Sequence, residues 1–250
     1  MKLRARILAG ERLIGTFVKT PDPHAVEILG LAGLDFIVVD QEHAPVGIGA
    51  LDLMVMAARS VGLPVLIRAT HGAAPALWPS LDLGAVGAMV PHVRDAAEAE
   101  AIAEAMKYAR GKRGFSPSGR AGGYGTEPAE AYRARMDEQS VILAQIEDAG
   151  ALDRLDEIAA VPEIDVLFVG PADLSLSLGC AMDAPELVSA IDRVIAAASA
   201  AGKATGLFVG TGAQVAHWAG KGITVFVCGS DQGLLLNAAR GLMQVARAEN

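Results

Sequence analysis

Short apolar runs of β-type residues alternate with helix-forming stretches along almost the whole chain. The runs are Ile14–Lys19, Phe36–Asp40, Pro64–Arg68, Val86–Pro91, Val141–Glu147, Val166–Gly170, Thr205–Val209 and Thr224–Cys228. Helical patterns between most of them cover Ala25–Ala32, Gly49–Val61, Ala74–Leu81, Ala96–Arg110, Leu152–Val161, Pro185–Ala201 and Ala213–Lys221. Strands that alternate with helices form a parallel sheet. Eight such units in 250 residues predict a single α/β domain, a closed (β/α)8 TIM barrel, ahead of a doubly wound open sheet.

Composition and charge exclude several classes of function. The net charge is -8 and only 4% of the residues are aromatic, which argues against a general nucleic-acid or anionic-membrane partner. The two cysteines, Cys180 and Cys228, do not make a disulfide framework. The first residues lack the apolar core of a signal peptide, and no apolar run reaches transmembrane length. We therefore expect a cytoplasmic protein that acts on small molecules.

Four apolar runs stop abruptly at charged or polar residues. They lie within Val38–His43, Val65–Arg68, Leu143–Asp148 and Leu167–Asp173. A buried parallel strand reads as a continuous apolar run, and α/β folds place their chemistry at the carboxyl ends of such strands. The sequence therefore predicts one site that contains carboxylates, a histidine and an arginine.

The carboxylates at the ends of the fifth and sixth strands, Glu147 and Asp173, are candidate metal ligands. Two carboxylates with few other protein ligands suit a hard divalent cation that keeps water or substrate oxygens in its shell. The competing interpretation is that both acids cap the helices that follow. The turn Gly170–Ser175 favours the site, because it can present backbone N–H groups near Ala172 and Asp173 to a small anion.

Other strand-end residues suggest acid–base and electrostatic roles. His43 follows two acids and suits a general base. Arg68 is expected to contact a substrate or enolate, or else to pair with a neighbouring acid. Asp82 is either a surface acid or a residue that orients a histidine. Lys19 ends the first strand, so a Schiff-base route stays open.

The stretch 111–125 is rich in glycine, serine and arginine, and it interrupts the alternation. It is too long for a simple connector, and long loops in compact domains are often functional. We expect a cover for the active site or a contact with a neighbouring subunit; a plain surface loop is the alternative.

Five motifs in order resemble the class II (metal-dependent) pyruvate aldolases, such as 4-hydroxy-2-oxoheptanedioate aldolase and 2-dehydro-3-deoxyglucarate aldolase. The motifs are Asp40-x-Glu42-His43, the strand-end Arg68, Leu81-Asp82-x-Gly84, Gln145-Ile146-Glu147 and Gly170–Ser175, and the resemblance runs from about Gly15 to about Asp231. It implies a barrel of the phosphoenolpyruvate/pyruvate superfamily. It also implies reversible cleavage of 4-hydroxy-2-oxo acids to pyruvate, or hydroxypyruvate, and an aldehyde through a metal-bound enolate.

The resemblance assigns a role to each matching residue. Glu147 and Asp173 would hold Mg²⁺, Mn²⁺ or Co²⁺, while Gln145 and the backbone at Ala172 and Asp173 would contact pyruvate. His43 would be the base with Asp82 raising its basicity, and Arg68 would stabilise the enolate. Family members are commonly homohexamers, trimers of dimers that exchange a C-terminal helix, and residues 234–248 are expected to form it.

The natural aldehyde stays open, because the segment Phe115–Ser118 departs from the namesake. Two other functions also remain. One is a carbon–carbon lyase for malyl- or citramalyl-type acyl-CoA thioesters on a related barrel. The other is a non-catalytic barrel that only binds a 2-oxo acid.

Overall fold

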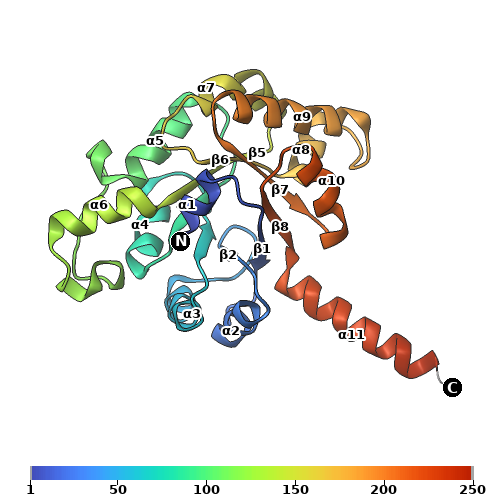
Figure 1. Ribbon diagram of the computed structural model, residues 1–250, viewed down its shortest axis with the longest axis horizontal. Helices are drawn as coiled ribbons and strands as arrows, with labels where there is room; N and C mark the ends of the chain where they lie inside the picture. The colour runs from blue at the N-terminus through green and yellow to red at the C-terminus, as the bar shows by residue number, and fades with distance from the viewer. Residues whose placement is uncertain (1, 249–250) are drawn as a thin grey trace.

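The computed structural model describes residues 2–248, and its eight strands close into a parallel barrel in sequence order (Figure 1). The predicted (β/α)8 barrel is therefore confirmed. The strands are β1 (Leu13–Val18), β2 (Phe36–Asp40), β3 (Val65–Arg68), β4 (Gly87–Val90), β5 (Val141–Ile146), β6 (Val166–Val169), β7 (Ala204–Val209) and β8 (Val225–Ser230). The α-helices are α1 (Leu3–Leu8), α2 (Pro23–Leu31), α3 (Ile48–Ser60), α4 (Ala74–Leu83), α5 (Ala96–Met106), α6 (Ala129–Gln139), α7 (Leu155–Ala159), α8 (Pro171–Leu178), α9 (Pro185–Ala200), α10 (Val215–Gly220) and α11 (Asp231–Ala248).

Two helices were not predicted from the sequence. The helix α6 buries only Tyr132 and Met136, so its apolar stripe is too thin to give a clear helical period. The helix α8 starts with Pro171 directly after the strand and has 8 residues. Its sequence was interpreted as a turn, although proline at the first helical position is a common start.

Side chains of each strand alternate between the barrel interior and the layer under the helices. In β2, Phe36 and Val38 belong to the interior cluster, while Ile37 and Val39 belong to the outer one. The next inward position is Asp40, because side chains along a strand repeat with period two. The same count places other polar groups inward at the upper rim of the barrel: Lys19 after Phe17, Arg68 after Leu66, and Gln145 after Leu143.

The lower end of the barrel is closed by α1. Leu3 and Ile7 of this helix are buried with the interior cluster. The interior is therefore a packed apolar core at this end, and the polar inward positions are confined to the carboxyl end of the strands.

The last helix, α11, extends away from the barrel (Figure 1). None of its residues is buried, although it carries large apolar side chains. These are Leu234, Leu235, Leu236, Leu242, Met243 and Val245, which are 46–74% exposed. Within residues 2–248, no helix is long and apolar enough to cross a bilayer.

Candidate active site

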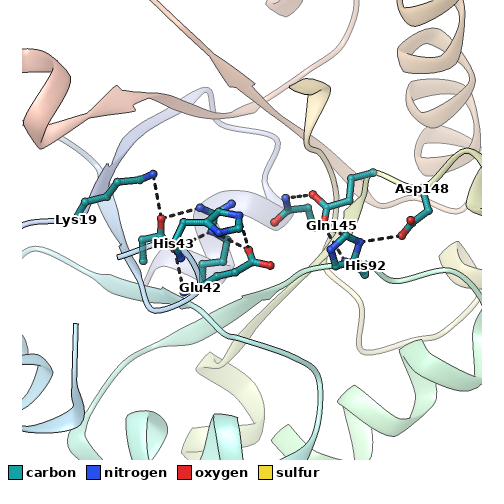
Figure 2. Close-up of polar contacts among 9 residues, drawn as sticks. Lys19, Glu42, His43, His92, Gln145 and Asp148 are labelled. Carbon is teal, nitrogen blue, oxygen red and sulfur yellow. Dashed lines mark hydrogen bonds and ion pairs between the residues drawn. The ribbon is translucent and has the colours of Figure 1, made fainter. Parts of the chain in front are cut away.

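A cavity of about 330 Å³ opens at the carboxyl end of the strands. Its walls combine charged, amide, aromatic and glycine residues from most of the barrel: Phe17, Lys19, Arg68, Gln145, Phe168, Gly170, Pro171, Ala172, Asp173, Phe208, Gly210, Gly229, Ser230 and Gly233. Figure 2 shows two networks of polar side chains at this end, one with Lys19, Glu42 and His43 and the other with Gln145, His92 and Asp148.

The first network is built around the fully buried Asp40. This residue lies opposite Arg68 in the β2–β3 register. The guanidinium donates from Nε to Oδ1 at 3.0 Å and from Nη2 to Oδ2 at 2.7 Å. Burial alone would raise the pKa of Asp40, but the hydrogen bonds and charge of Arg68 hold that pKa below its ordinary value. The pairing that the sequence left as the alternative for Arg68 is therefore present, and the guanidinium still lines the cavity.

The loop after β2 is held in place by the same carboxylate. The backbone N–H groups of Glu42 and His43 both donate to Asp40 Oδ1 at 3.1 Å. Glu42 Oε2 lies 3.4 Å from Arg68 Nε and 3.5 Å from His43 Nε2. The His43 ring is 55% exposed, so it stands at the rim with the Glu42 carboxylate beside it.

The second network fixes Glu147. The Glu147 carboxylate accepts from Gln145 Nε2 and from the backbone N–H of His92, the latter at 2.9 Å. The His92 ring lies 3.0 Å from Asp148 Oδ2, and its backbone has a φ of 54°. A left-handed conformation at a residue other than glycine costs about 1–3 kcal/mol, and such strain clusters at functional sites. The strained loop therefore holds one carboxylate of the site in a single orientation.

Electrostatics single out Glu147 among the carboxylates. Burial raises its pKa to about 7, against the opposing N–H and charge of His92, and the negative charge of Asp173 adds to the rise. The negative charges of these two carboxylates in a cleft favour a nearby cation, which would relieve their repulsion. Within residues 2–248, no group of three or more histidine, cysteine or acidic side chains is arranged to hold a metal ion.

The start of α8 supplies backbone donors beside the carboxylates. The first hydrogen bond inside this helix runs from Leu174 N–H to Gly170 C=O at 3.0 Å. The N–H groups of Ala172 and Asp173 come before it, so they take no part in helical bonding. Both residues line the cavity, where these groups suit a carboxylate ligand.

The donor set fits a hard divalent cation. Glu147 and Asp173 offer carboxylate oxygens, and Gln145 Oε1 is buried with no hydrogen-bond partner in residues 2–248. A buried acceptor without a partner is costly unless a ligand satisfies it. Gln145 Oε1, in the cavity with the two acids, would therefore be stabilised by a hydrogen-bond donor or a cation from a bound ligand.

Gly170 makes this crowding feasible. A Cβ placed there would lie 2.6 Å from Glu147 Oε2 and 2.8 Å from Gln145 Nε2. Glycine is thus required by the close approach of two side chains and not by an unusual backbone, because its φ is −93°.

Asp82 is separated from the other predicted site residues. It lies in the last turn of α4, next to the lower end of β4, and pairs with Arg113 at 3.3 Å. Burial raises its pKa, against the charge of Arg113. No hydrogen bond joins it to His43 within the part of the chain that the structure describes. The predicted pairing of Asp82 with His43 is therefore not formed inside one chain, because the helix carries Asp82 toward the opposite end of the barrel.

The segment 111–125 also lies outside the cavity of its own chain. Arg113 contacts Asp82, Arg120 pairs with Asp52 at 2.6 Å, and Gly119 packs on the backbone of Asp82. The segment thus covers α3 and α4. It does not cover the active site of its own chain.

Sequence reasoning underestimated two residues. Asp40 was named only as part of a motif, with no role of its own, yet it organises Arg68, Lys19 and the His43 loop. His92 was not among the candidate residues, yet its backbone N–H holds Glu147. Counting inward positions along each strand identifies Asp40, but His92 acts through its backbone, which its residue type does not reveal.

Comparisons with known proteins agree over nearly the full length. The family model described as HpcH/HpaI aldolase/citrate lyase matches residues 13–238. The chain is 33% identical over 244 residues to the 5-keto-4-deoxy-D-glucarate aldolase of Shigella dysenteriae serotype 1 (strain Sd197), covering 96% of this chain and 94% of that one. It is 35% identical over 233 residues to the 2-dehydro-3,6-dideoxy-6-sulfogluconate aldolase of Pseudomonas putida, covering 92% and 91%. The crystal structure of an HpcH/HpaI aldolase/citrate lyase family protein from Burkholderia cenocepacia J2315 matches with a TM-score of 0.93 at 30% identity, covering 98% of each chain.

Proposed function

Because this chain belongs to the HpcH/HpaI aldolase/citrate lyase family, we propose that it is a metal-dependent aldolase that cleaves 4-hydroxy-2-oxo acids to pyruvate and an aldehyde. The observation that carries the proposal is the pair Glu147 and Asp173 beside Gln145 Oε1, which has no hydrogen-bond partner in residues 2–248. A divalent cation at this pair, Mg²⁺, Mn²⁺ or Co²⁺, would supply a Lewis acid that polarises the keto group of the substrate.

Pyruvate, which donates the carbon nucleophile in the aldol reaction and is called the donor substrate, would bind between β5, β6 and α8. The N–H groups of Ala172 and Asp173 would donate hydrogen bonds to its carboxylate, and Gln145 would contact the same end of the molecule. Both networks fix their side chains before a ligand arrives, so little reorganisation is needed on binding.

Proton transfer would be carried by His43. Its ring is at the rim beside Glu42, and it would take a proton from C3 of pyruvate during synthesis, or from the C4 hydroxyl during cleavage. Arg68 would stabilise the negative charge that develops on the enolate oxygen. Asp40 holds the guanidinium in place through two hydrogen bonds.

The oligomer proposed here is a homohexamer built from dimers that exchange α11. An isolated helix with six large exposed apolar side chains is stable only when it packs against another surface. Exposed apolar residues on α2 and α3, namely Ile28, Leu31, Ile48, Leu53 and Met56, offer such a surface on a second copy. In this assembly, Asp82 would reach a histidine only across a subunit boundary.

The cytoplasmic location remains a prediction.

A lyase screen coupled to pyruvate detection tests the function directly. We expect cleavage of 4-hydroxy-2-oxo acids that is lost after EDTA treatment and dialysis and restored by Mn²⁺. His43→Ala should sharply slow exchange of the C3 protons of pyruvate. Activity that survives metal removal would refute the metal-dependent route.

The family description also covers citrate lyases, so thioester substrates require a separate test. Titration with coenzyme A and with an acyl-CoA substrate distinguishes a thioester lyase from an aldolase. Binding of 2-oxo acids without any turnover in the presence of Mn²⁺ would indicate a barrel that only binds its ligand.

A further inference from the structure

The active-site cavity has two chemically different walls. The wall from β5, β6 and α8 contains the proposed donor site, with Gln145 and Asp173. The second wall comes from the ends of β1, β7 and β8 and the start of α11, and it contributes two aromatic rings, one lysine, one serine and three glycines: Phe17, Lys19, Phe208, Gly210, Gly229, Ser230 and Gly233. The glycines leave space there, so a second substrate can extend toward this wall.

Lys19 is the one charged side chain that this second wall contributes to the cavity. Its ammonium lies 3.4 Å from Asp40 Oδ2, which is longer than the usual charge-assisted hydrogen bond of about 2.7–2.9 Å. That oxygen already accepts from Arg68 Nη2 at 2.7 Å. An ammonium has three donors, so Lys19 retains hydrogen-bonding capacity for a ligand.

The backbone of Lys19 is fixed by the first residue of α11. The N–H groups of Lys19 and Thr20 donate to the two carboxylate oxygens of Asp231 at 2.9 and 3.0 Å. The lysine side chain therefore leaves from a rigid rim, and only its own torsions must be ordered when it binds a ligand.

We propose that Lys19 determines acceptor specificity by binding an anionic group, a carboxylate, at the end of a short aldehyde remote from its carbonyl. The inference rests on the proposed aldolase function and specifies its second substrate. The cavity volume of about 330 Å³ is at the lower end for ligand pockets, which favours a short acceptor. The reacting carbonyl faces the donor wall, while the distal carboxylate reaches the ammonium on the other.

Two acceptors of equal chain length test the proposal. Succinic semialdehyde carries the distal carboxylate and butanal lacks it. In aldol addition to pyruvate, Lys19→Gln should reduce the preference for succinic semialdehyde over butanal, as a ratio of kcat/KM, by about 10- to 100-fold, since a hydrogen bond to a charged group is lost. The loss should appear mainly in KM for the aldehyde, and Lys19→Arg should restore most of the preference. Lys221→Gln, which removes a surface charge paired with Asp192, is the matched control and should keep the wild-type preference.

A binding measurement keeps the inference independent of turnover. Calorimetry with succinate, in the presence of pyruvate and Mn²⁺, should give a dissociation constant at least tenfold weaker for Lys19→Gln than for the wild type. Equal losses for both aldehydes together with unchanged succinate binding would overturn the role of Lys19. A covalent pyruvate adduct on Lys19 after borohydride reduction would overturn it in favour of a Schiff base. Absence of pyruvate proton exchange in the wild type would refute the aldolase function, while succinate binding still decides the role of Lys19.

Discussion

Gly170→Ala is the sharpest single test of the proposed geometry, because it adds one methyl group where two functional side chains meet. The new Cβ would lie 2.6 Å from Glu147 Oε2, whereas ordinary contact begins at 3.4 Å. The carboxylate must therefore retreat by about 0.8 Å. It has little freedom to do so, because its residue is 3% exposed and its other oxygen accepts from His92 N–H.

The expected result is a large loss of activity with a small loss of stability. A misplacement of about 1 Å in a catalytic group costs on the order of 100-fold in rate. Overpacking lowers the free energy of unfolding by about 1–3 kcal/mol. The change from glycine to alanine offsets about 0.4–1 kcal/mol of this loss, because it reduces the conformational entropy of the unfolded chain. We therefore expect roughly a 100-fold drop in pyruvate C3 proton exchange, at least tenfold weaker binding of Mn²⁺ and a melting temperature only a few degrees lower.

Proton exchange followed by NMR, calorimetric Mn²⁺ binding and thermal melting measure these three quantities. Gly150→Ala is the matched control, because a Cβ there meets no atom within 4 Å. Wild-type exchange and wild-type Mn²⁺ affinity in Gly170→Ala would show that Glu147 does not hold the cation in the described orientation.

Three further predictions concern the metal, the arginine and the assembly. The raised pKa of Glu147, about 7 against an ordinary value of 4.5, makes the folded metal-free protein bind a proton more tightly than the unfolded chain. The contribution of Glu147 to stability therefore falls as pH rises from its ordinary pKa of 4.5 through its folded-state pKa of about 7. The increase in melting temperature on adding Mn²⁺ should consequently be larger at pH 8 than at pH 5.5. An equal increase at both pH values would contradict this prediction. Arg68→Lys loses the two-point pairing with Asp40, so proton exchange should fall about 10- to 100-fold, and an unchanged rate would exclude Arg68 as the enolate partner. Replacing both Leu235 and Leu242 with lysine should reduce the molar mass measured by light scattering, whereas an unchanged mass would show that α11 does not join subunits.

The barrel was predictable because its signals are local and repeated. Each strand has its own apolar run, and the eight runs were found with ends displaced by at most two residues. The resemblance to the aldolase family and the assignment as a carbon–carbon lyase, both made from short motifs, are confirmed by the family match. The helix α8 was missed because Gly170 and Pro171 resemble a turn when no neighbouring strand is considered.

The site was only partly predictable, because sequence position does not fix spatial neighbours. Strand-end residues such as Arg68 and Gln145 follow from counting inward positions in a closed barrel. The separation of Asp82 from His43 does not, since it depends on how far α4 descends before it ends. The contact between His92 N–H and Glu147 depends on a single positive φ, which no residue pattern signalled.

The two hydrogen bonds that Asp231 accepts have a mechanical consequence. Asp231 is the first residue of α11, the helix that extends away from the barrel, and its carboxylate also holds the rim beside the cavity. A partner that changed the orientation of this helix would therefore move the β1–α2 connection through the hydrogen bonds to Asp231. If α11 joins subunits as proposed, loss of that contact would loosen the rim of the pocket, and a dissociated subunit would turn over poorly although its own active-site residues are intact.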